Sequence, residues 1–244
     1  TPRPSRRQRQ MCIRDRGWLV IQRAMTAGMS LDSVLVDGTR IDDMPELPAD
    51  VDVISAGPEV LSDVGGRPTL RDPIGCFTRP VPTSVEDLLE RSSTLAVLEG
   101  IVNPTNMGVI MRCAAGLGID AVLVDPTSCD PLYRRAVRVS MGECYAIPHS
   151  LLDPIPGGLE VLREAGFALV ALTPTSDAVD IDELSRRRPA RLAIMLGSEG
   201  PGLSPAALTA ADHLVRIPMS AGVDSINVGT AAAVAFHAFS TAQR

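Results

Sequence analysis

The feature that most constrains the fold is an alternation of apolar and helical segments from Thr94 onward. Short runs that are apolar throughout are typical of strands buried on both faces, and stretches with helical spacing lie along the chain between them. The pattern predicts a parallel α/β sheet covered by helices on both faces. The expected strands are "LAVLEGI", "AVLVDP", "ALVALTP", "LAIMLGS" and "HLVRIPM", and the expected helices lie near 105–118, 131–141, 157–165, 204–211 and 225–242.

The segment 17–82 has a shorter, mixed pattern, typical of a small α/β module, and we expect its beginning to be missing. "WLVIQRAMTAG" and "PEVLSDVGG" predict helices, whereas "SVLVDG" and "VDVISAG" predict strands closed by turn residues. Residues 83–93 predict a linker helix, with Thr83 or Ser84 as its N-cap. We therefore expect a second domain over 94–244, joined to the first by this linker.

The first sixteen residues, "TPRPSRRQRQMCIRDR", have no apolar periodicity and hold six Arg against one Asp. Such a run can act as a basic RNA-binding arm. We favour a cloning or assembly scar, because "MCIRDR" resembles a translated library adaptor, and we expect residues 1–16 to be disordered and outside the fold.

The amino-acid composition limits the kinds of catalytic and binding site that this chain can hold. All 23 basic residues are Arg, so Schiff-base catalysis and a P-loop, which both need Lys, are excluded. Because the formal net charge is −6, any nucleic-acid surface must be a local Arg patch.

The cysteines and the apolar runs indicate the cellular compartment in which the protein is found. Five widely spread cysteines without a CxxC pair favour reduced thiols and no metal site. No apolar run is long enough to cross a bilayer, and no secretory signal is visible. We expect a cytoplasmic protein that contacts no membrane.

The loops after the strands show which classes of binding site are possible, because ligands of parallel sheets bind at the carboxyl ends of strands. The first loop reads "EGIVNPTNMG", which lacks the GxGxxG of a dinucleotide fold and the glycine-rich turn of Rossmann-type methyltransferases. A nucleotide-dependent oxidoreductase is therefore disfavoured. The GxSxG elbow of hydrolases is absent too. Instead, "LGSEGPGLSP" (196–205) packs three Gly around one acid, which permits close approach of a ligand to the backbone.

Three stretches in order resemble one family. "NPTNMGVIMRCAAGLGIDAVLV", "LGSEGPGLS" and "IPMSAGVDSINVGTAAA" resemble the three motifs of the SpoU (TrmH-like) branch of the SPOUT RNA 2′-O-ribose methyltransferases. The resemblance covers about residues 94–242, with Ile226 in place of the family's Leu. Residues 17–82 are similar, less strongly, to the L30e-like RNA-binding domain that often precedes this catalytic domain.

The resemblance implies a parallel-sheet SPOUT domain whose C-terminal segment forms a trefoil knot. It implies that S-adenosylmethionine binds in this knot and that the protein is a homodimer through the knot region. Carried over to this chain, the cofactor contacts fall on Gly197, Ile217 and Ile226, with further candidates at Leu172, Thr173, Leu196, Gly200 and Met219. Plain core packing of Ile217 and Ile226 is the alternative, and it is compatible with an apolar adenine pocket.

For catalysis the resemblance implies Asn106, Arg112, Glu199, Ser225 and Asn227. An Arg with a pKa above about 12 is a poor general base. We therefore expect Arg112 to face the later motifs and to bind a phosphate and stabilise alkoxide charge. Asn106, Ser225 and Asn227 lie near helix starts, so N-capping is their structural alternative.

RNA contact is expected at Arg134, Arg135 and Arg138 in "PLYRRAVRVSMG", where a solvated helix face is the alternative. The run "RRRPAR" (186–191) reads as a surface turn. The N-terminal module favours ribosomal RNA over tRNA by analogy. The competing function is a non-catalytic RNA-binding protein on the same fold.

Overall fold

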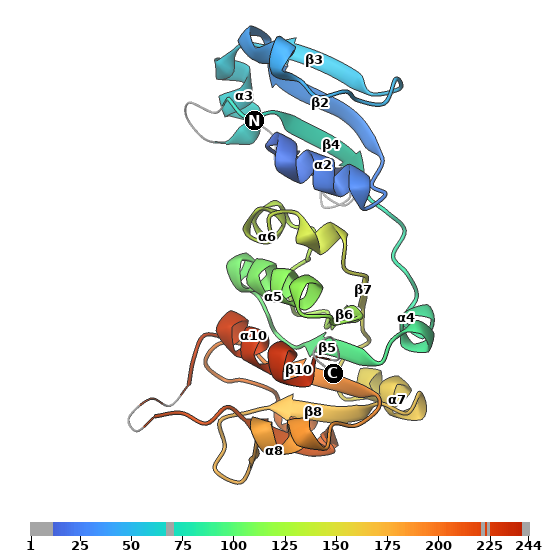
Figure 1. Ribbon diagram of the computed structural model, residues 1–244, viewed down its shortest axis with the longest axis vertical. Helices are drawn as coiled ribbons and strands as arrows, with labels where there is room; N and C mark the ends of the chain where they lie inside the picture. The colour runs from blue at the N-terminus through green and yellow to red at the C-terminus, as the bar shows by residue number, and fades with distance from the viewer. Residues whose placement is uncertain (1–11, 67–70, 221–222, 224, 241–244) are drawn as a thin grey trace. The chain divides into compact units, whose positions relative to one another are not determined.

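The computed structural model describes residues 12–66, 71–220, 223 and 225–240 (Figure 1). The chain divides into two compact units. The first comprises residues 1–81 and 132–146, and the second comprises residues 82–131 and 147–244.

The second unit is built on a seven-stranded sheet in the order β7-β6-β5-β10-β8-β11-β9. All of its strand pairings are parallel, as the alternating pattern predicts. The five predicted strands are confirmed as β5 (Thr94–Leu98), β6 (Ala121–Val124), β8 (Ala168–Leu172), β10 (Leu192–Leu196) and β11 (His213–Arg216). The short edge strands β7 (His149–Leu151) and β9 (Val179–Asp180) were not predicted, because two or three residues carry no periodicity.

Helices cover both faces of this sheet. A buried cluster joins one face to α4 (Val85–Arg91), α7 (Gly157–Glu164) and α9 (Pro205–Ala210). The opposite face is covered by α5 (Pro104–Gly116), α8 (Ile181–Arg186) and α10 (Val228–Phe239), of which α5 and α10 pack against each other. The linker helix predicted over 83–93 is α4, and its N-cap is Ser84, whose hydroxyl accepts the Asp87 amide at 3.1 Å.

The first unit has a four-stranded mixed sheet in the order β1-β4-β2-β3. Its predicted elements are confirmed as α2 (Trp18–Thr26), β2 (Leu31–Asp37), β3 (Asp52–Ala56) and α3 (Pro58–Gly65). Strand β4 (Ile74–Thr78), in a short run with Gly and Cys, was not predicted, nor was the 3-10 helix η1 (Gly38–Asp43).

Two expected boundaries are wrong. Residues 12–16 were expected to be disordered, but they form β1 (Cys12–Arg16), antiparallel to β4, because an open sheet edge offers backbone partners to any extended segment. Residues 1–11 lie outside the described residues. The segment 132–146 was expected within the methyltransferase domain, but it packs with the first unit.

The contacts of that segment are specific. It carries α6 (Arg134–Val139) and the 3-10 helix η2 (Glu143–Tyr145). Arg23 donates to the Met141 carbonyl at 2.7 Å and pairs with the Glu143 carboxylate at 3.0 Å. The rings of Phe77 and Tyr145 lie 6.2 Å apart. The segment 132–146, which lies between β6 and β7, therefore belongs to the first unit.

The run "RRRPAR" is more than a surface turn. Arg191 donates to the carbonyls of Ala165 at 2.6 Å and Leu89 at 2.5 Å, and its guanidinium lies 4.2 Å from the centre of the Phe167 ring. Arg188 donates to the Phe239 carbonyl at 2.8 Å, at the end of α10. These side chains tie the ends of several elements to the sheet.

No helix among the residues that the structure describes is long and apolar enough to cross a membrane. The same residues include no group of three His, Cys, Asp or Glu side chains placed to hold a metal ion.

We predict that Arg191→Lys lowers the free energy of unfolding by about 1–2 kcal/mol, because an ammonium cannot reproduce the planar fork that reaches two carbonyls and stacks on Phe167. Urea denaturation measures the change. Arg186→Lys is the matched control, because Arg186 is exposed and no hydrogen bond is described for it. Equal stabilities of the two variants would contradict the role given to Arg191.

Candidate functional site

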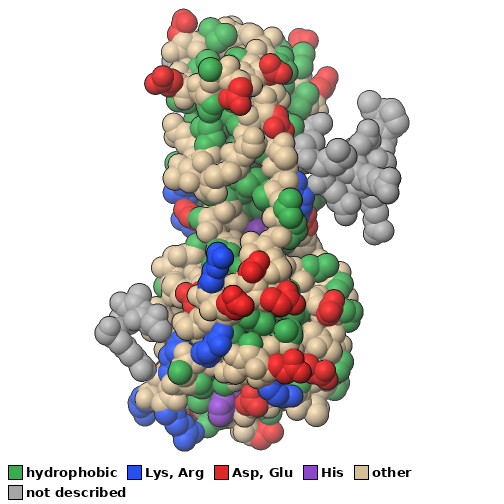
Figure 2. Space-filling model, turned by 90° about the vertical axis from the view of Figure 1, so that its right-hand side faces the viewer, with side chains coloured by type: hydrophobic (Ala, Val, Ile, Leu, Met, Phe, Trp, Pro, Cys, Tyr) green, Lys and Arg blue, Asp and Glu red, His purple; other side chains and the backbone are tan. Residues whose placement is uncertain are grey.

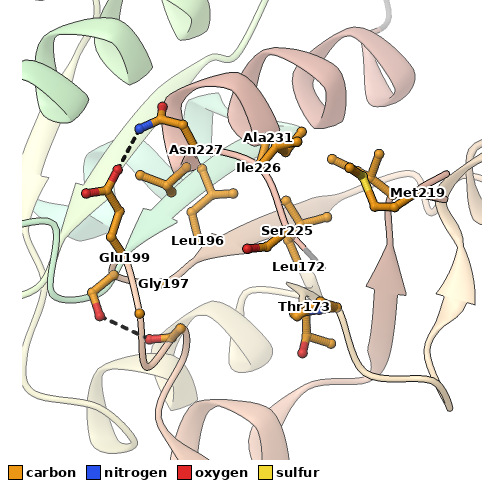
Figure 3. Close-up of a pocket in the computed structure, with 16 residues that line it drawn as sticks. Leu172, Thr173, Leu196, Gly197, Glu199, Met219, Ser225, Ile226, Asn227 and Ala231 are labelled. Carbon is orange, nitrogen blue, oxygen red and sulfur yellow. Dashed lines mark hydrogen bonds between the residues drawn. The ribbon is translucent and has the colours of Figure 1, made fainter. Parts of the chain in front are cut away.

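A cavity of about 400 Å³ lies at the carboxyl ends of β8, β10 and β11 (Figure 3). All eight residues carried over as cofactor contacts line it, and they come from segments far apart in the sequence. They are Leu172, Thr173, Leu196, Gly197, Gly200, Ile217, Met219 and Ile226. Of the residues implied in catalysis, Glu199, Ser225 and Asn227 also line the cavity.

The wall formed by 197–203 is a tight glycine loop. A Cβ atom at Gly197 would lie 2.2 Å from the Gly202 carbonyl carbon and the Leu203 nitrogen, so only glycine fits there. Gly200 and Gly202 have φ angles of 90° and 73°, which favour glycine. The loop folds back on itself, and Ser198 and Gly202 form a β-bridge. Main-chain groups therefore approach the cavity closely.

An acid that was not predicted holds the far end of this loop. Glu99, directly after β5, accepts the Ser204 amide at 2.8 Å. Ser204 in turn caps α9 by accepting the Ala207 amide at 3.1 Å. Glu99 therefore holds the residue at which the glycine loop ends and α9 begins. Its place directly after a buried strand, in "LEGIVNPTN", was the available signal.

The neighbouring loop is fixed by a second unpredicted acid, Asp125. It is buried and accepts the Gly100 amide at 3.0 Å and the Ser128 hydroxyl at 2.6 Å. Burial alone would raise the pKa of Asp125, but hydrogen bonds from Ser128, Thr127 and Gly100 outweigh it and hold that pKa below its usual value. A Cβ at Gly100 would lie 3.3 Å from that of Ser198. The loops after β5, β6 and β10 are therefore packed together.

Asn227 joins the three motifs. Its Oδ1 atom caps α10 by accepting the Gly229 amide at 2.9 Å. That orientation turns its Nδ2 atom toward Asn106 Oδ1, at 3.1 Å, and toward Glu199 Oε1, at 2.5 Å. Figure 3 shows the bond to Glu199. Capping was the structural alternative for Asn227, and the residue caps while its amide nitrogen bridges the other two motifs.

The other polar candidates differ from one another. Asn106 is 6% exposed and does not cap α5, because Asn103 accepts the Thr105 amide at 2.9 Å and fills that place. Ser225 is exposed at the cavity wall and lies before Asn227, which is the N-cap of α10, so capping by Ser225 is excluded as well.

For Arg112, the expectation that it faces the later motifs stays a prediction. It is exposed on α5, it is not among the residues that line the cavity, and no hydrogen bond is described for it. Arg112 follows Asn106 by six residues, which places it about 240° further around a helix. It therefore projects in a different direction from the bridged Asn106.

The predicted RNA-contacting arginines lie on α6, in the first unit. Arg134 donates to the carbonyl of Gly65 at 3.2 Å, at the end of α3. Arg135 and Arg138 are exposed. On the face that Figure 2 shows, acidic and basic side chains are intermixed, so positive charge is confined to small areas there.

Comparison of the chain with known protein families shows the family to which it belongs. The profile of the SpoU rRNA Methylase family matches residues 93–237, which span the cavity and all three motifs. This chain belongs to that family.

The SpoU chain is also similar to individual relatives. An uncharacterized tRNA/rRNA methyltransferase of Mycobacterium tuberculosis is 39% identical over 91% of this chain and 78% of its own. The 23S rRNA (guanosine-2′-O-)-methyltransferase of Nitrosomonas europaea is 33% identical over 62% of this chain and 58% of its own. Family and relatives together make the SpoU protein described here an RNA methyltransferase.

Solved structures share the fold of this SpoU protein. The AdoMet-bound rRNA methyltransferase from Sinorhizobium meliloti has a TM-score of 0.81 at 21% identity, and covers 96% of this chain and 88% of its own. The SpoU methyltransferase AviRb from Streptomyces viridochromogenes, in complex with AdoMet, has a TM-score of 0.79 at 23% identity, and covers 97% and 92%. The α/β fold with its parallel sheet is confirmed on this basis.

We predict that two variants of Asn227 differ in how their stability depends on pH. Asn227→Ala removes the helix cap and both bridging donors, so the free energy of unfolding should fall by about 1–3 kcal/mol at any pH between neutral and mildly acidic. Asn227→Asp keeps the capping oxygen but sets a second carboxylate against Glu199. Like charges should destabilise this variant at neutral pH, and protonation of one carboxylate should restore stability on acidification.

Urea denaturation at neutral and mildly acidic pH measures both effects. The same pH dependence in the two variants would show that Glu199 does not face residue 227 in solution.

Proposed function

We propose that this protein transfers the methyl group of S-adenosylmethionine to a ribose 2′-OH of RNA. The observation that carries the proposal is the bridge from Asn227 to Asn106 and Glu199 at the wall of the cavity. It brings a polar residue from each of three separate motifs to one place. A site that only packs the core has no need of this polar arrangement.

The residues of the cavity fit this cofactor. Bound S-adenosylmethionine supplies an electrophilic methyl group on a positively charged sulfur. Leu172, Leu196, Ile217, Met219 and Ile226 offer apolar walls to the adenosyl group, and the glycine loop offers free backbone groups. Among the described residues that line the cavity, Glu199 is the one that is ionisable, and its sign of charge suits a cation.

The chain's own groups suggest how the 2′-OH is activated. Asn227 holds Glu199 Oε1, and no hydrogen bond is described for Oε2. We assign Glu199 Oε2 to accept the proton of the 2′-OH as oxygen attacks the methyl group. Asn227, which is bonded to Asn106, fixes the carboxylate, and Ser225, which lines the cavity, is assigned to hydrogen-bond the ribose.

Arg112 is assigned to the RNA backbone. An exposed guanidinium stays charged and suits a phosphate, with which it can form two parallel hydrogen bonds. This role as a charge clamp requires no contact with the cavity wall, in keeping with the position of Arg112 on α5.

The remaining expectations form part of the proposal. Ribosomal RNA is the favoured substrate, since the first unit is a separate α/β module that we interpret as L30e-like. Arg135 and Arg138 on α6, with Arg134, would contact RNA from that unit. We expect a trefoil knot at the C-terminal segment, a homodimer through it, which analytical ultracentrifugation tests, and a cytoplasmic location.

One observation favours the competing function, a non-catalytic RNA-binding protein. The exposed position of Arg112, outside the set of residues that line the cavity, also suits a chain that binds RNA and transfers nothing. Incubation with labelled S-adenosylmethionine and total RNA separates the two. A 2′-O-methylnucleoside in the digested RNA supports the proposal, and binding of RNA without transfer supports the alternative.

We predict that Arg112→Ala reduces methyl transfer by at least about 100-fold, because the RNA phosphate is no longer held and the 2′-OH is no longer positioned for attack. Affinity for S-adenosylmethionine should remain within about twofold, because the side chain does not line the cavity. Transfer assays and calorimetry measure the two quantities. Arg186→Ala, at an exposed position on α8, is the control and should transfer normally. Normal transfer by Arg112→Ala would remove Arg112 from the mechanism.

A further inference from the structure

A second hollow, of about 80 Å³, lies within the first unit, between the start of α2, the end of β2 and the approach to β4. Its lining includes Trp18 and Pro73, two acids, Asp37 and Asp72, and two arginines, Arg40 and Arg71. Its size corresponds to several water molecules, so it has room for the edge of a planar ring and none for a whole nucleotide. No residue of the three methyltransferase motifs takes part in it.

Asp37 gives the hollow an unsatisfied acceptor. The residue ends β2 and is 3% exposed. Its Oδ1 atom accepts the Thr39 amide at 3.0 Å and the Thr39 hydroxyl at 2.8 Å. Its Oδ2 atom is buried, and no group in the described part of the chain donates to it. Buried carboxylate oxygens are normally hydrogen-bonded, so this atom has the capacity to accept one further hydrogen bond.

The charges around Asp37 limit what that donor can be. Hydrogen bonds from Thr39 hold the pKa of Asp37 below its usual value, and the positive charges of Arg71 and Arg40 act in the same direction against burial. The carboxylate is therefore ionised at neutral pH. Arg40 and Arg71 offset the charges of Asp37 and Asp72, so the hollow lacks the net negative charge that a metal ion or an ammonium group needs, and the guanidinium groups can bind phosphate. The donor should consequently be a neutral N–H on a phosphate-bearing molecule.

Trp18 adds a stacking surface. It is the only Trp of the chain, and it is half-buried at the first residue of α2. Unpaired bases of RNA are recognised by stacking on aromatic side chains together with hydrogen bonds to their edges. An indole, an ionised acceptor and two guanidinium groups around one small hollow form such a set.

We propose that this hollow binds one unpaired, amino-bearing nucleobase of the RNA substrate. The base stacks against Trp18, its amino group donates to Asp37 Oδ2, and Arg40 and Arg71 contact the flanking phosphates. The inference rests on the proposed function for its choice of RNA as the ligand. It goes beyond that function by assigning base preference to a site in the first unit.

The chemistry sets a preference between two bases of equal ring size. Cytosine presents an amino group where uracil presents a carbonyl oxygen. A carbonyl would meet the Asp37 carboxylate with like partial charge, whereas an amino group satisfies it. The site should therefore discriminate cytosine from uracil, since a charged acceptor left unpaired weakens binding more than a missing neutral contact does.

Trp18 supplies the measurement. The full chain is titrated with short oligocytidylate and with oligouridylate of equal length, without S-adenosylmethionine, and the fluorescence of the single Trp is followed. We expect saturable quenching, with oligocytidylate binding roughly tenfold more tightly, as a hydrogen bond to a charged group implies. Absence of quenching, or equal affinity for the two, overturns the proposal.

A charge-neutral variant makes the test specific. In Asp37→Asn, the side-chain oxygen can still accept from Thr39, so the amide nitrogen faces the hollow and the preference should turn toward oligouridylate. Asp63→Asn, at an exposed position on α3, is the matched control and should keep the preference of the unmodified chain. Circular dichroism establishes that Asp37→Asn is folded.

If folded Asp37→Asn keeps the original preference, the base is not read by Asp37 and the proposal fails. If methyl transfer is observed while the oligonucleotides leave Trp18 unchanged, the proposed function stands and this site alone is refuted. The reverse result, quenching with a base preference but no methyl transfer, refutes the proposed function and retains this site.

Discussion

The arrangement of the site depends on the hydrogen bonds that the side-chain amide of Asn227 makes. An N-cap oxygen must face the first free amides of its helix, and this fixes the direction of the amide nitrogen. In α10 that nitrogen meets Asn106 from α5 and Glu199 from the glycine loop. One local requirement of helix capping thus sets the relative positions of three segments that lie up to 121 residues apart.

Further hydrogen bonds hold the ends of the loops around this bridge. Glu99 holds the residue that ends the glycine loop and begins α9, and Asp125 ties the loops after β5 and β6 together. Arg188 holds the last turn of α10 from the opposite end. The cavity is therefore formed by irregular loops whose ends are fastened to a rigid parallel sheet. Such fastening lets backbone groups of a glycine-rich loop keep one geometry without a bound ligand.

Much of the fold was predictable because its signal is periodic. The strand "LAIML" is buried along its whole length, and this pattern is found in parallel sheets with helices on both faces. The residues that line the cavity came from resemblance of motifs, and no periodicity marks them. Asn227 was a candidate on that basis, but its contact with Glu199 depends on distances between loops that a sequence does not contain.

Other features gave no usable signal. Helix α6 buries Ala136 and Val137, and the same apolar pair would suit the core of either unit. Arg191 lies in a run of arginines that is typical of a solvated surface, although it spans two carbonyls and a ring. Strand β1 follows from an open sheet edge rather than from its own residues. Arg112 was expected to face the later motifs by resemblance alone, and its place six residues after Asn106 puts it on another face of α5.

The central claim is that the cavity formed by the second and third motifs binds S-adenosylmethionine. Methyl NMR of isoleucine-labelled protein tests it most directly, because Ile217 and Ile226 line the cavity, whereas Ile74 lies in the core of the first unit. On titration with S-adenosylmethionine, the account predicts that the Ile217 and Ile226 resonances shift to saturation and that the Ile74 resonance stays in place. Unchanged Ile217 and Ile226 resonances at excess cofactor would contradict it.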